Sequence, residues 1–216
     1  MSIPESNGKI LLITGINGYI GSRIGLDALS RGYSIRGTSR SIASTRALLE
    51  GPFAPYADRV EVFEVSDITA PNAFDAAAKG VHGIFHVASP VNFALTTWDT
   101  VVVPAIGGTN TLLTSALQQA GPQLEAVVVT SSVTALLNRD APEGYVTTEA
   151  DENTWAIDAA KNLDADGVPE GQRGGILYSA SKVAALRAVQ EFRDTHKVGP
   201  EYYITPPKCL PLTLST

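Results

Sequence analysis

Short apolar runs alternate along the chain with longer stretches in which apolar residues recur at helical spacing. Such runs are typical of strands that are buried on both faces of a parallel sheet. We expect five strands, over residues 9–13, 33–39, 60–65, 81–87 and 125–130, with helices between them over about 20–30, 42–50, 72–78 and 97–119. This alternation predicts an α/β fold: a doubly wound parallel sheet of the Rossmann type, which binds ligands outside the carboxyl ends of its strands.

The last third of the chain is less regular. Residues 136–175 form a polar excursion that contains glycine and proline, with at most one helical turn near 155–160. We expect a helix to open at Tyr178 and to continue to about Arg193, and a sixth strand over 201–205. Pro206-Pro207 follows, and the chain stops at Thr216. The expected organisation is a dinucleotide-binding domain over 1–200 and an atypical tail over 201–216.

Three glycines follow the first expected strand at intervals of three and open a helix. Gly15 permits a tight turn, Gly18 lets the backbone approach a pyrophosphate, and Gly21 lets helix and strand pack closely. The free N–H groups and the dipole at the helix N-terminus favour a phosphate there. Three glycines alone also fit a turn that binds nothing, but the flanking strand and helix favour a dinucleotide site.

The second expected strand ends at Arg40, and no acidic residue lies between Arg31 and Ala47. An acid at this position binds the ribose diol of NAD, whereas an arginine accommodates the 2′-phosphate of NADP. We therefore predict NADP(H) as the cofactor, with Arg40 as the main phosphate contact and Ser39 or Ser41 as helpers. The alternative is that Arg40 is a solvated loop residue.

The next two strand ends carry further candidates. Asp67 would accept a hydrogen bond from the adenine amino group while Ile68 packs on the ring; equally, Asp67 would cap the next turn. Ala88 and Ser89 are small enough for the central riboses of a dinucleotide to pass close to the backbone. His86 lies inside the fourth strand without a partner at metal-ligand spacing, so we expect a hydrogen-bonded core histidine and no metal site.

A catalytic arrangement is expected where the fifth strand ends in Thr130-Ser131-Ser132 and a helix follows with Tyr178 and Lys182. These two residues are four apart and share one helix face. A phenol with a pKa near 10 is a poor acid at neutral pH, and a nearby ammonium brings that pKa down. Tyr178 would then supply a proton to a carbonyl oxygen held by Ser132, and Lys182 would also contact the nicotinamide ribose. The Tyr–Lys spacing is common on helices, so the prediction depends on the order of all the motifs.

Four segments together resemble the extended short-chain dehydrogenase/reductase family: Thr14–Gly21, Phe85–Pro90, Val129–Ser132 and Tyr178–Lys182. The similarity covers about residues 8–196 and is greatest to the branch of dihydroflavonol reductases, cinnamoyl-CoA reductases and yeast-type aldehyde/ketone reductases. It implies an NADPH-dependent reductase of ketones or aldehydes with Ser132, Tyr178 and Lys182 as its triad. Ser132 matches the family's catalytic serine better than Ser131. The predicted cofactor contacts are Gly15, Asn17, Gly18, Tyr19, Ile20, Gly21, Arg40, Asp67, Ile68, Ala88, Ser89, Tyr178 and Lys182.

The chain departs from that family at its C-terminal end. Members usually exceed 300 residues and use their C-terminal part for the substrate pocket, so the substrate lobe is largely missing here. Apolar surface that this lobe would cover is expected to be exposed and to favour self-association. Two other functions stay open: a catalytically silent NADP-binding module, and an NAD-dependent nucleotide-sugar epimerase or dehydratase, which would carry an acid where Arg40 stands.

Composition and charge limit the kinds of molecule that this protein is expected to bind. The 216 residues carry a net charge of −6 and no basic run, which argues against nucleic acid or an anionic membrane. Cys209 is the single cysteine, so no internal disulfide forms. No uninterrupted apolar run has the length of a membrane span, and no signal-peptide core is present. The expected setting is cytoplasmic, with a small-molecule carbonyl compound as substrate.

Overall fold

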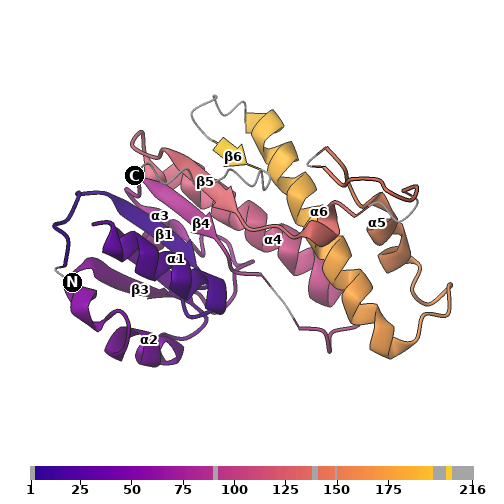
Figure 1. Cartoon of the computed structure of the whole chain (residues 1–216), viewed down its shortest axis with the longest axis horizontal. Coiled ribbons are helices and arrows are strands. Elements are labelled where there is room, and N and C mark those ends of the chain that lie inside the picture. The colour runs from indigo at the N-terminus through magenta and orange to yellow at the C-terminus, as the bar shows by residue number, and fades with distance from the viewer. Residues whose placement is uncertain (1–2, 90–91, 138–140, 149, 197–202, 206–216) are drawn as a thin grey trace.

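The computed structural model describes residues 3–89, 92–137, 141–148, 150–196 and 203–205 (Figure 1). Over these residues the strands form one sheet of order β3-β2-β1-β4-β5-β6, and every neighbouring pair is parallel. The strands are β1 (Ile10–Thr14), β2 (Ser34–Ser39), β3 (Val60–Glu64), β4 (Gly83–His86), β5 (Ala126–Val129) and β6 (Tyr203–Thr205). The order reverses between β1 and β4, as in a doubly wound sheet, and confirms the predicted Rossmann-type fold.

Helices connect the strands and cover both faces of the sheet (Figure 1). The α-helices are α1 (Tyr19–Ser30), α2 (Arg46–Glu50), α3 (Asp75–Ala78), α4 (Trp98–Ser115), α5 (Thr154–Lys161) and α6 (Glu170–His196). Shorter helical segments are η1 (Ile42–Thr45), η2 (Ala54–Arg59), η3 (Ala116–Ala120) and η4 (Val133–Ala135). The expected helix over 42–50 is thus divided into η1 and α2.

The core is layered because successive side chains of β1 point to opposite faces. Leu12 belongs to a cluster with α3, α4 and α6, whereas its neighbour Ile13 packs with α1 and with Phe53 on the other face. Both side chains are fully buried, and burial of each contributes about 1.5–3 kcal/mol. A third cluster joins α4, α5 and α6 beyond the edge of the sheet. The carboxyl ends of β1, β4 and β5 are thereby fixed side by side.

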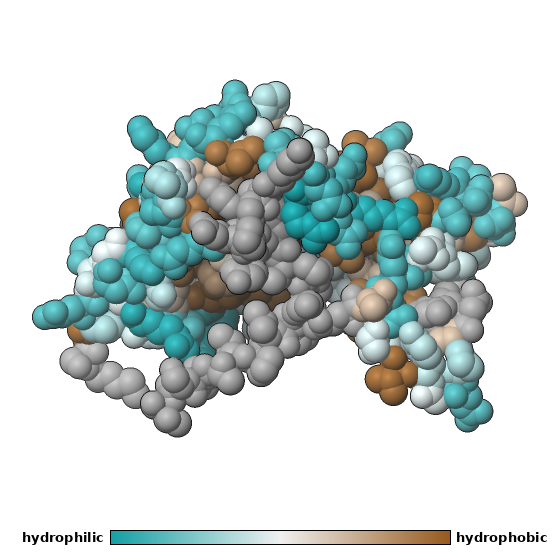
Figure 2. Space-filling model, turned by 90° about the horizontal axis from the view of Figure 1, so that it is seen from above, coloured by the Kyte–Doolittle hydropathy of each residue, from teal (hydrophilic) through white to brown (hydrophobic). Residues whose placement is uncertain are grey.

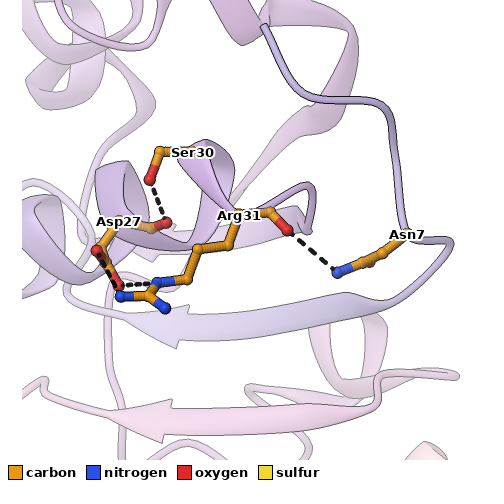
Figure 3. A network of polar contacts seen from close by, with 4 residues as sticks. All are labelled: Asn7, Asp27, Ser30 and Arg31. Carbon is orange, nitrogen blue, oxygen red and sulfur yellow. Dashed lines mark hydrogen bonds and ion pairs between the residues drawn. The ribbon is translucent and has the colours of Figure 1, made fainter. Parts of the chain in front are cut away.

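The N-terminal segment is tied to the far end of α1, away from the glycine turn (Figure 3). The Nε atom of Arg31 donates to Asp27 one turn earlier at 2.8 Å, and the Ser30 hydroxyl donates to the Asp27 carbonyl oxygen. The side-chain amide of Asn7 donates to the carbonyl oxygen of Arg31, and the backbone N–H of Asn7 donates to the carbonyl oxygen of Gly32. The carbonyl groups left open at the helix end are therefore satisfied by the segment that leads into β1.

The run Trp98–Ala120, made of α4 and η3, has the length and composition of a membrane-spanning helix, with a mean hydropathy of 1.3 in its most apolar window. The expectation from the sequence considered only uninterrupted apolar runs, none of which has this length. The run Trp98–Ala120 contains polar residues among its apolar ones. Val102 and Leu112 are fully buried against α6 and the sheet. Half of the window is buried in this way, which is typical of a core helix.

Two expectations for the last third of the chain were wrong in their bounds. The helix that carries Tyr178 begins at Glu170, about two turns earlier than predicted, and α5 is a full helix over Thr154–Lys161. Only glycine fits at position 174 in the added turns, because a Cβ there would collide with the carbonyl oxygen of Phe93. Residues 201–202, Pro206-Pro207 and the tail to Thr216 lie outside the described residues.

Candidate functional site

The glycine turn after β1 has the geometry that its sequence predicted. Gly15 has a positive φ of 68°, which side-chain-bearing residues rarely adopt. A Cβ on Gly15 would lie 3.2 Å from the backbone of Ala88, and a Cβ on Gly21 would collide with the carbonyl oxygen of Gly15. Helix α1 therefore begins in close contact with β1. The N–H groups of its first turn, at Tyr19 and Ile20, have no partner within the helix and point toward the strand ends.

Thr14, just before this turn, ties β1 to the segment after β4. Its Oγ1 accepts hydrogen bonds from the N–H groups of Val87 and Ala88, both at 3.0 Å. With both lone pairs used, the Thr14 hydroxyl donates its hydrogen to Nδ1 of His86, 2.9 Å away. His86 is thus neutral, with its hydrogen on Nε2.

This finding confirms the expected hydrogen-bonded core histidine. His86 is 4% exposed, and its ring packs against the Phe74 ring in a T-shaped arrangement with the ring centres 6.1 Å apart. Burial, and to a smaller degree the charge of Lys182, lower the pKa of His86 to about 3. The role of Thr14 itself was missed, because a threonine at a strand end gives no sign in the sequence of which backbone groups it will bind.

The segment after β2 lies against the glycine turn. The Asn17 amide donates to Ser44 Oγ at 3.0 Å, and Ser44 Oγ is 2.8 Å from Ser39 Oγ. Ser44 also donates to the carbonyl oxygen of Ser41. Arg40 stands between these serines, is exposed, and makes no ion pair with any residue in the described ranges. Its guanidinium is therefore available at the edge of the turn.

The Asp67-Ile68 pair fits both alternatives left open by the sequence. Asp67 Oδ1 accepts from the N–H and the hydroxyl of Thr69 at 2.8 and 2.7 Å, the pattern of a turn cap, and these bonds lower the pKa of Asp67. The carboxylate is exposed, so the cap does not withdraw it from a ligand. Ile68 packs on Gly108 of α4, where a Cβ would collide with it.

The ends of β4 and β5 meet at Lys182 of α6. Its Nζ donates to Ser89 Oγ at 3.2 Å and to the carbonyl oxygen of Thr130 at 3.5 Å. Lys182 is 7% exposed, and burial lowers its pKa. The ammonium lies 5.7 Å from the centre of the Tyr178 ring, one turn earlier on the same helix. The structure thus brings Ser89, Thr130, Tyr178 and Lys182 together.

Tyr178 has an aromatic neighbour that sequence reasoning missed. The ring of Phe93 lies 5.7 Å from that of Tyr178, centre to centre, at an angle of 51°. Phe93 is 62% exposed and follows the β4 end by several residues. The Phe85–Pro90 motif ends before it, so nothing in the pattern pointed to this contact.

The two serines after β5 differ in their surroundings. Ser132 is the N-cap of η4, and its Oγ accepts from the N–H of Thr134 at 3.3 Å and from the Thr134 hydroxyl at 3.0 Å. Ser131 Oγ is buried and has no hydrogen-bond partner among the described residues. Segment η4, which Ser132 precedes, packs against α6, the helix that carries Tyr178 and Lys182. Within the described ranges, no cluster of histidine, cysteine and acidic residues has a metal-binding arrangement.

A doubly wound parallel sheet with a glycine turn at its switch point defines the dinucleotide-binding class of α/β proteins. Residues 11–162 match the model of the NAD dependent epimerase/dehydratase family, and the chain belongs to that family. Its predicted resemblance to extended short-chain dehydrogenases/reductases is thereby confirmed.

Similar proteins include reductases that are longer than this chain. The chain is 37% identical over 196 residues to Aldehyde reductase 2 of Sporidiobolus salmonicolor, a match that covers 90% of this chain and 55% of that protein. It is 32% identical over 189 residues to Ketoreductase sphI of Aspergillus fumigatus, covering 87% and 55%. The crystal structure of Gre2 from Candida albicans in complex with NADPH has a TM-score of 0.74 at 25% identity and covers 91% of this chain and 56% of its own. The chain spans about half the length of the curated relatives it matches.

Proposed function

We propose that this chain is the dinucleotide-binding part of an NADPH-dependent carbonyl reductase that acts on a ketone or an aldehyde. The observation that carries the proposal is the buried ammonium of Lys182, which joins the ends of β4 and β5 to the helix of Tyr178. Its partners in the described structure are neutral oxygens, so its charge is available to a ligand and to the phenol. Relatives that are named aldehyde reductase and ketoreductase support the reaction class.

NADP(H) would lie along the strand ends. Gly15, Gly18 and Gly21 keep the path free of side chains, and the first-turn N–H groups of Tyr19 and Ile20 would hold the pyrophosphate. Asp67 and Ile68 would contact the adenine, and Ala88 and Ser89 the central riboses. The close approach of Ala88 to Gly15 leaves backbone, not side chains, at this crossing, which fits such a ligand. When bound, the cofactor would supply the hydride.

The three side chains of the triad would divide the remaining work. Ser132 would donate a hydrogen bond to the carbonyl oxygen of the substrate. Tyr178 would give its phenolic proton to that oxygen as the hydride reaches the carbon. The charge of Lys182 would stabilise the phenolate left on Tyr178, and its N–H groups would hold the ribose hydroxyls.

The preference for NADPH over NADH rests on Arg40. Arg40 is exposed and directly follows β2, and hydrogen bonds join the neighbouring Ser39 and Ser41 to Ser44. Titration of both cofactors against tryptophan fluorescence tests this preference. Arg40→Ala should weaken NADPH binding at least tenfold and leave NADH binding nearly unchanged, because only the 2′-phosphate meets the guanidinium. Equal losses for both cofactors would contradict it.

A screen of NADPH oxidation over aldehydes and ketones tests the reaction. Wild type should turn over at least one substrate, and Tyr178→Phe, which keeps the ring but lacks the proton, should be at least 100-fold slower. Equal turnover of the two proteins would overturn the mechanism.

We also propose that the protein is located in the cytoplasm.

A catalytically silent NADP-binding module is the second candidate. NADPH binding without turnover of any substrate would support it. An NAD-dependent nucleotide-sugar epimerase would instead bind NADH better than NADPH in the titration.

Self-association through apolar surface also remains a proposal. From above, the molecule is mainly hydrophilic, with hydrophobic residues in separate groups (Figure 2). Exposed apolar side chains include Phe93, Val133 and Val146. Sedimentation of the chain at rising concentration would measure whether they join copies.

A further inference from the structure

The hydroxyl of Ser132 has one free hydrogen-bonding function. A serine oxygen can accept two hydrogen bonds and donate one. The N–H and the hydroxyl of Thr134 occupy both acceptor positions of Ser132 Oγ, at 3.3 and 3.0 Å. The hydrogen of Ser132 is then the one group that these two bonds leave unused. Thr134 therefore makes Ser132 a donor.

Thr134 is in turn held by a buried asparagine from the excursion before α5. Asn153 is 4% exposed. Its Nδ2 donates to the Thr134 carbonyl oxygen at 2.8 Å, and its backbone N–H donates to the carbonyl oxygen of Ala135 at 2.8 Å. Its Oδ1 accepts from the N–H of Ala156 and caps α5.

The same asparagine links this turn to the helix of Tyr178 and Lys182. Helix α5 packs against α6, where Ile157 and Leu177 share one apolar cluster. Next to Asn153, Glu152 forms an ion pair with Arg187 of α6. The turn of Ser132 and the face of α6 are thus connected through one buried side chain and its neighbour.

We propose that Thr134, held by Asn153, is a positioning residue that fixes the Ser132 hydroxyl as a hydrogen-bond donor toward the carbonyl oxygen of the substrate. The proposal rests on the proposed function, in which Ser132 contacts that oxygen. Neither residue touches the substrate. They act on catalysis by orienting the hydroxyl hydrogen of Ser132. This hydrogen would stabilise the negative charge that develops on the carbonyl oxygen of the substrate.

A double-mutant cycle on kcat separates this role from general support of the fold. Thr134→Val removes the hydroxyl that donates to Ser132 and keeps the size of the side chain. It should lower kcat about tenfold, the effect of one misplaced hydrogen bond. In the Ser132→Ala background the same change should lower kcat less than twofold, because no hydroxyl remains to be oriented. Equal losses in the two backgrounds would overturn the proposal.

Three comparisons sharpen the cycle. Thr134→Ser keeps the donor and should restore most of the lost kcat. Asn153→Asp keeps the cap of α5 but loses the donor to the Thr134 carbonyl oxygen, and it should lower kcat while the fluorescence-measured Kd of NADPH stays within twofold. Thr109→Val removes a buried hydroxyl that donates inside α4, far along the chain from this turn. A loss of kcat in Thr109→Val as large as in Thr134→Val would assign the effect to packing.

Urea unfolding of the full chain gives a readout that needs no activity. Thr134→Val and Ser132→Ala should be non-additive in the free energy of unfolding, since each removes the same hydrogen bond. Additive effects would overturn the contact and the proposal with it. If the wild-type chain oxidises no NADPH, the proposed function fails and the catalytic role of Thr134 fails with it. Non-additive unfolding would then still establish that Thr134 holds Ser132.

Discussion

Thr14 and Ser132 are hydroxyl residues at the ends of two strands of the same sheet, and their hydrogen bonds differ. The Thr14 hydroxyl accepts from two backbone N–H groups and donates to His86, so all of its capacity is used inside the protein. The Ser132 hydroxyl accepts twice from Thr134 and keeps its hydrogen. The same chemical group thus closes one strand end and leaves the other able to bind. The difference lies in the partners, not in the strand position.

The largest expected effect is on catalysis at Ser132. Ser132→Ala should lower kcat by about 10²–10³-fold, the range for a lost donor to a developing oxyanion. NADPH oxidation with the substrate found in the screen measures it. Ser131→Ala is the matched control: its hydroxyl is buried and unpaired within the described chain, so its removal should preserve kcat. A larger loss in Ser131→Ala than in Ser132→Ala would exchange their roles.

The next effect is on stability at Thr14. Thr14→Val leaves His86 Nδ1 and the N–H groups of Val87 and Ala88 without their buried partner. We expect the free energy of unfolding to fall by about 3 kcal/mol. Urea unfolding measures this loss, and Thr14→Ser, which keeps the hydroxyl, should recover most of it. If Thr14→Val were as stable as wild type, the contrast with Ser132 would disappear.

A pH titration sharpens the part played by His86. Its pKa is about 3 in the folded chain, against 6.5 for the free side chain, because burial disfavours the charged ring. Between these values the unfolded state binds one more proton, so stability falls as the pH falls. The slope is about 1.4 kcal/mol per pH unit from this group. His86→Asn keeps an acceptor for Thr14. Its free energy of unfolding should depend less on pH between pH 6 and 4 than that of wild type. An equal pH dependence in the two proteins would contradict the assignment.

The smallest expected effect is a gain in stability when Lys182 is replaced. Lys182 is buried with neutral partners in the described structure, and its lowered pKa reflects the cost of burying the charge. Lys182→Met should raise the free energy of unfolding by about 1 kcal/mol. Urea unfolding measures this change in stability. A less stable Lys182→Met would mean that the ammonium has a structural role.

The strands and the glycine turn were predictable because their signals are local. Buried parallel strands are apolar along their length, and Gly15 and Gly21 occupy positions where a Cβ does not fit. The start of α6 was not predictable, because Gly171, Gly174 and Gly175 disfavour a helix by propensity and Gly174 is required by its contact with Phe93. The binding of Thr14 to His86 and of Thr134 to the Asn153 amide was also out of reach, since the tertiary fold brings these partners together.

The early start of α6 has a consequence for insertions and deletions. Tyr178 and Lys182 lie well inside a helix whose beginning is fixed by α5 and by the close approach of Gly174 to Phe93. One residue added between Gly174 and Tyr178 would turn the phenol about 100° around the helix axis, because an α-helix has 3.6 residues per turn. The same addition between α5 and α6, over residues 162–169, would be absorbed by the loop. Insertions and deletions that preserve the positions of Tyr178 and Lys182 are therefore expected between α5 and α6 and not within α6.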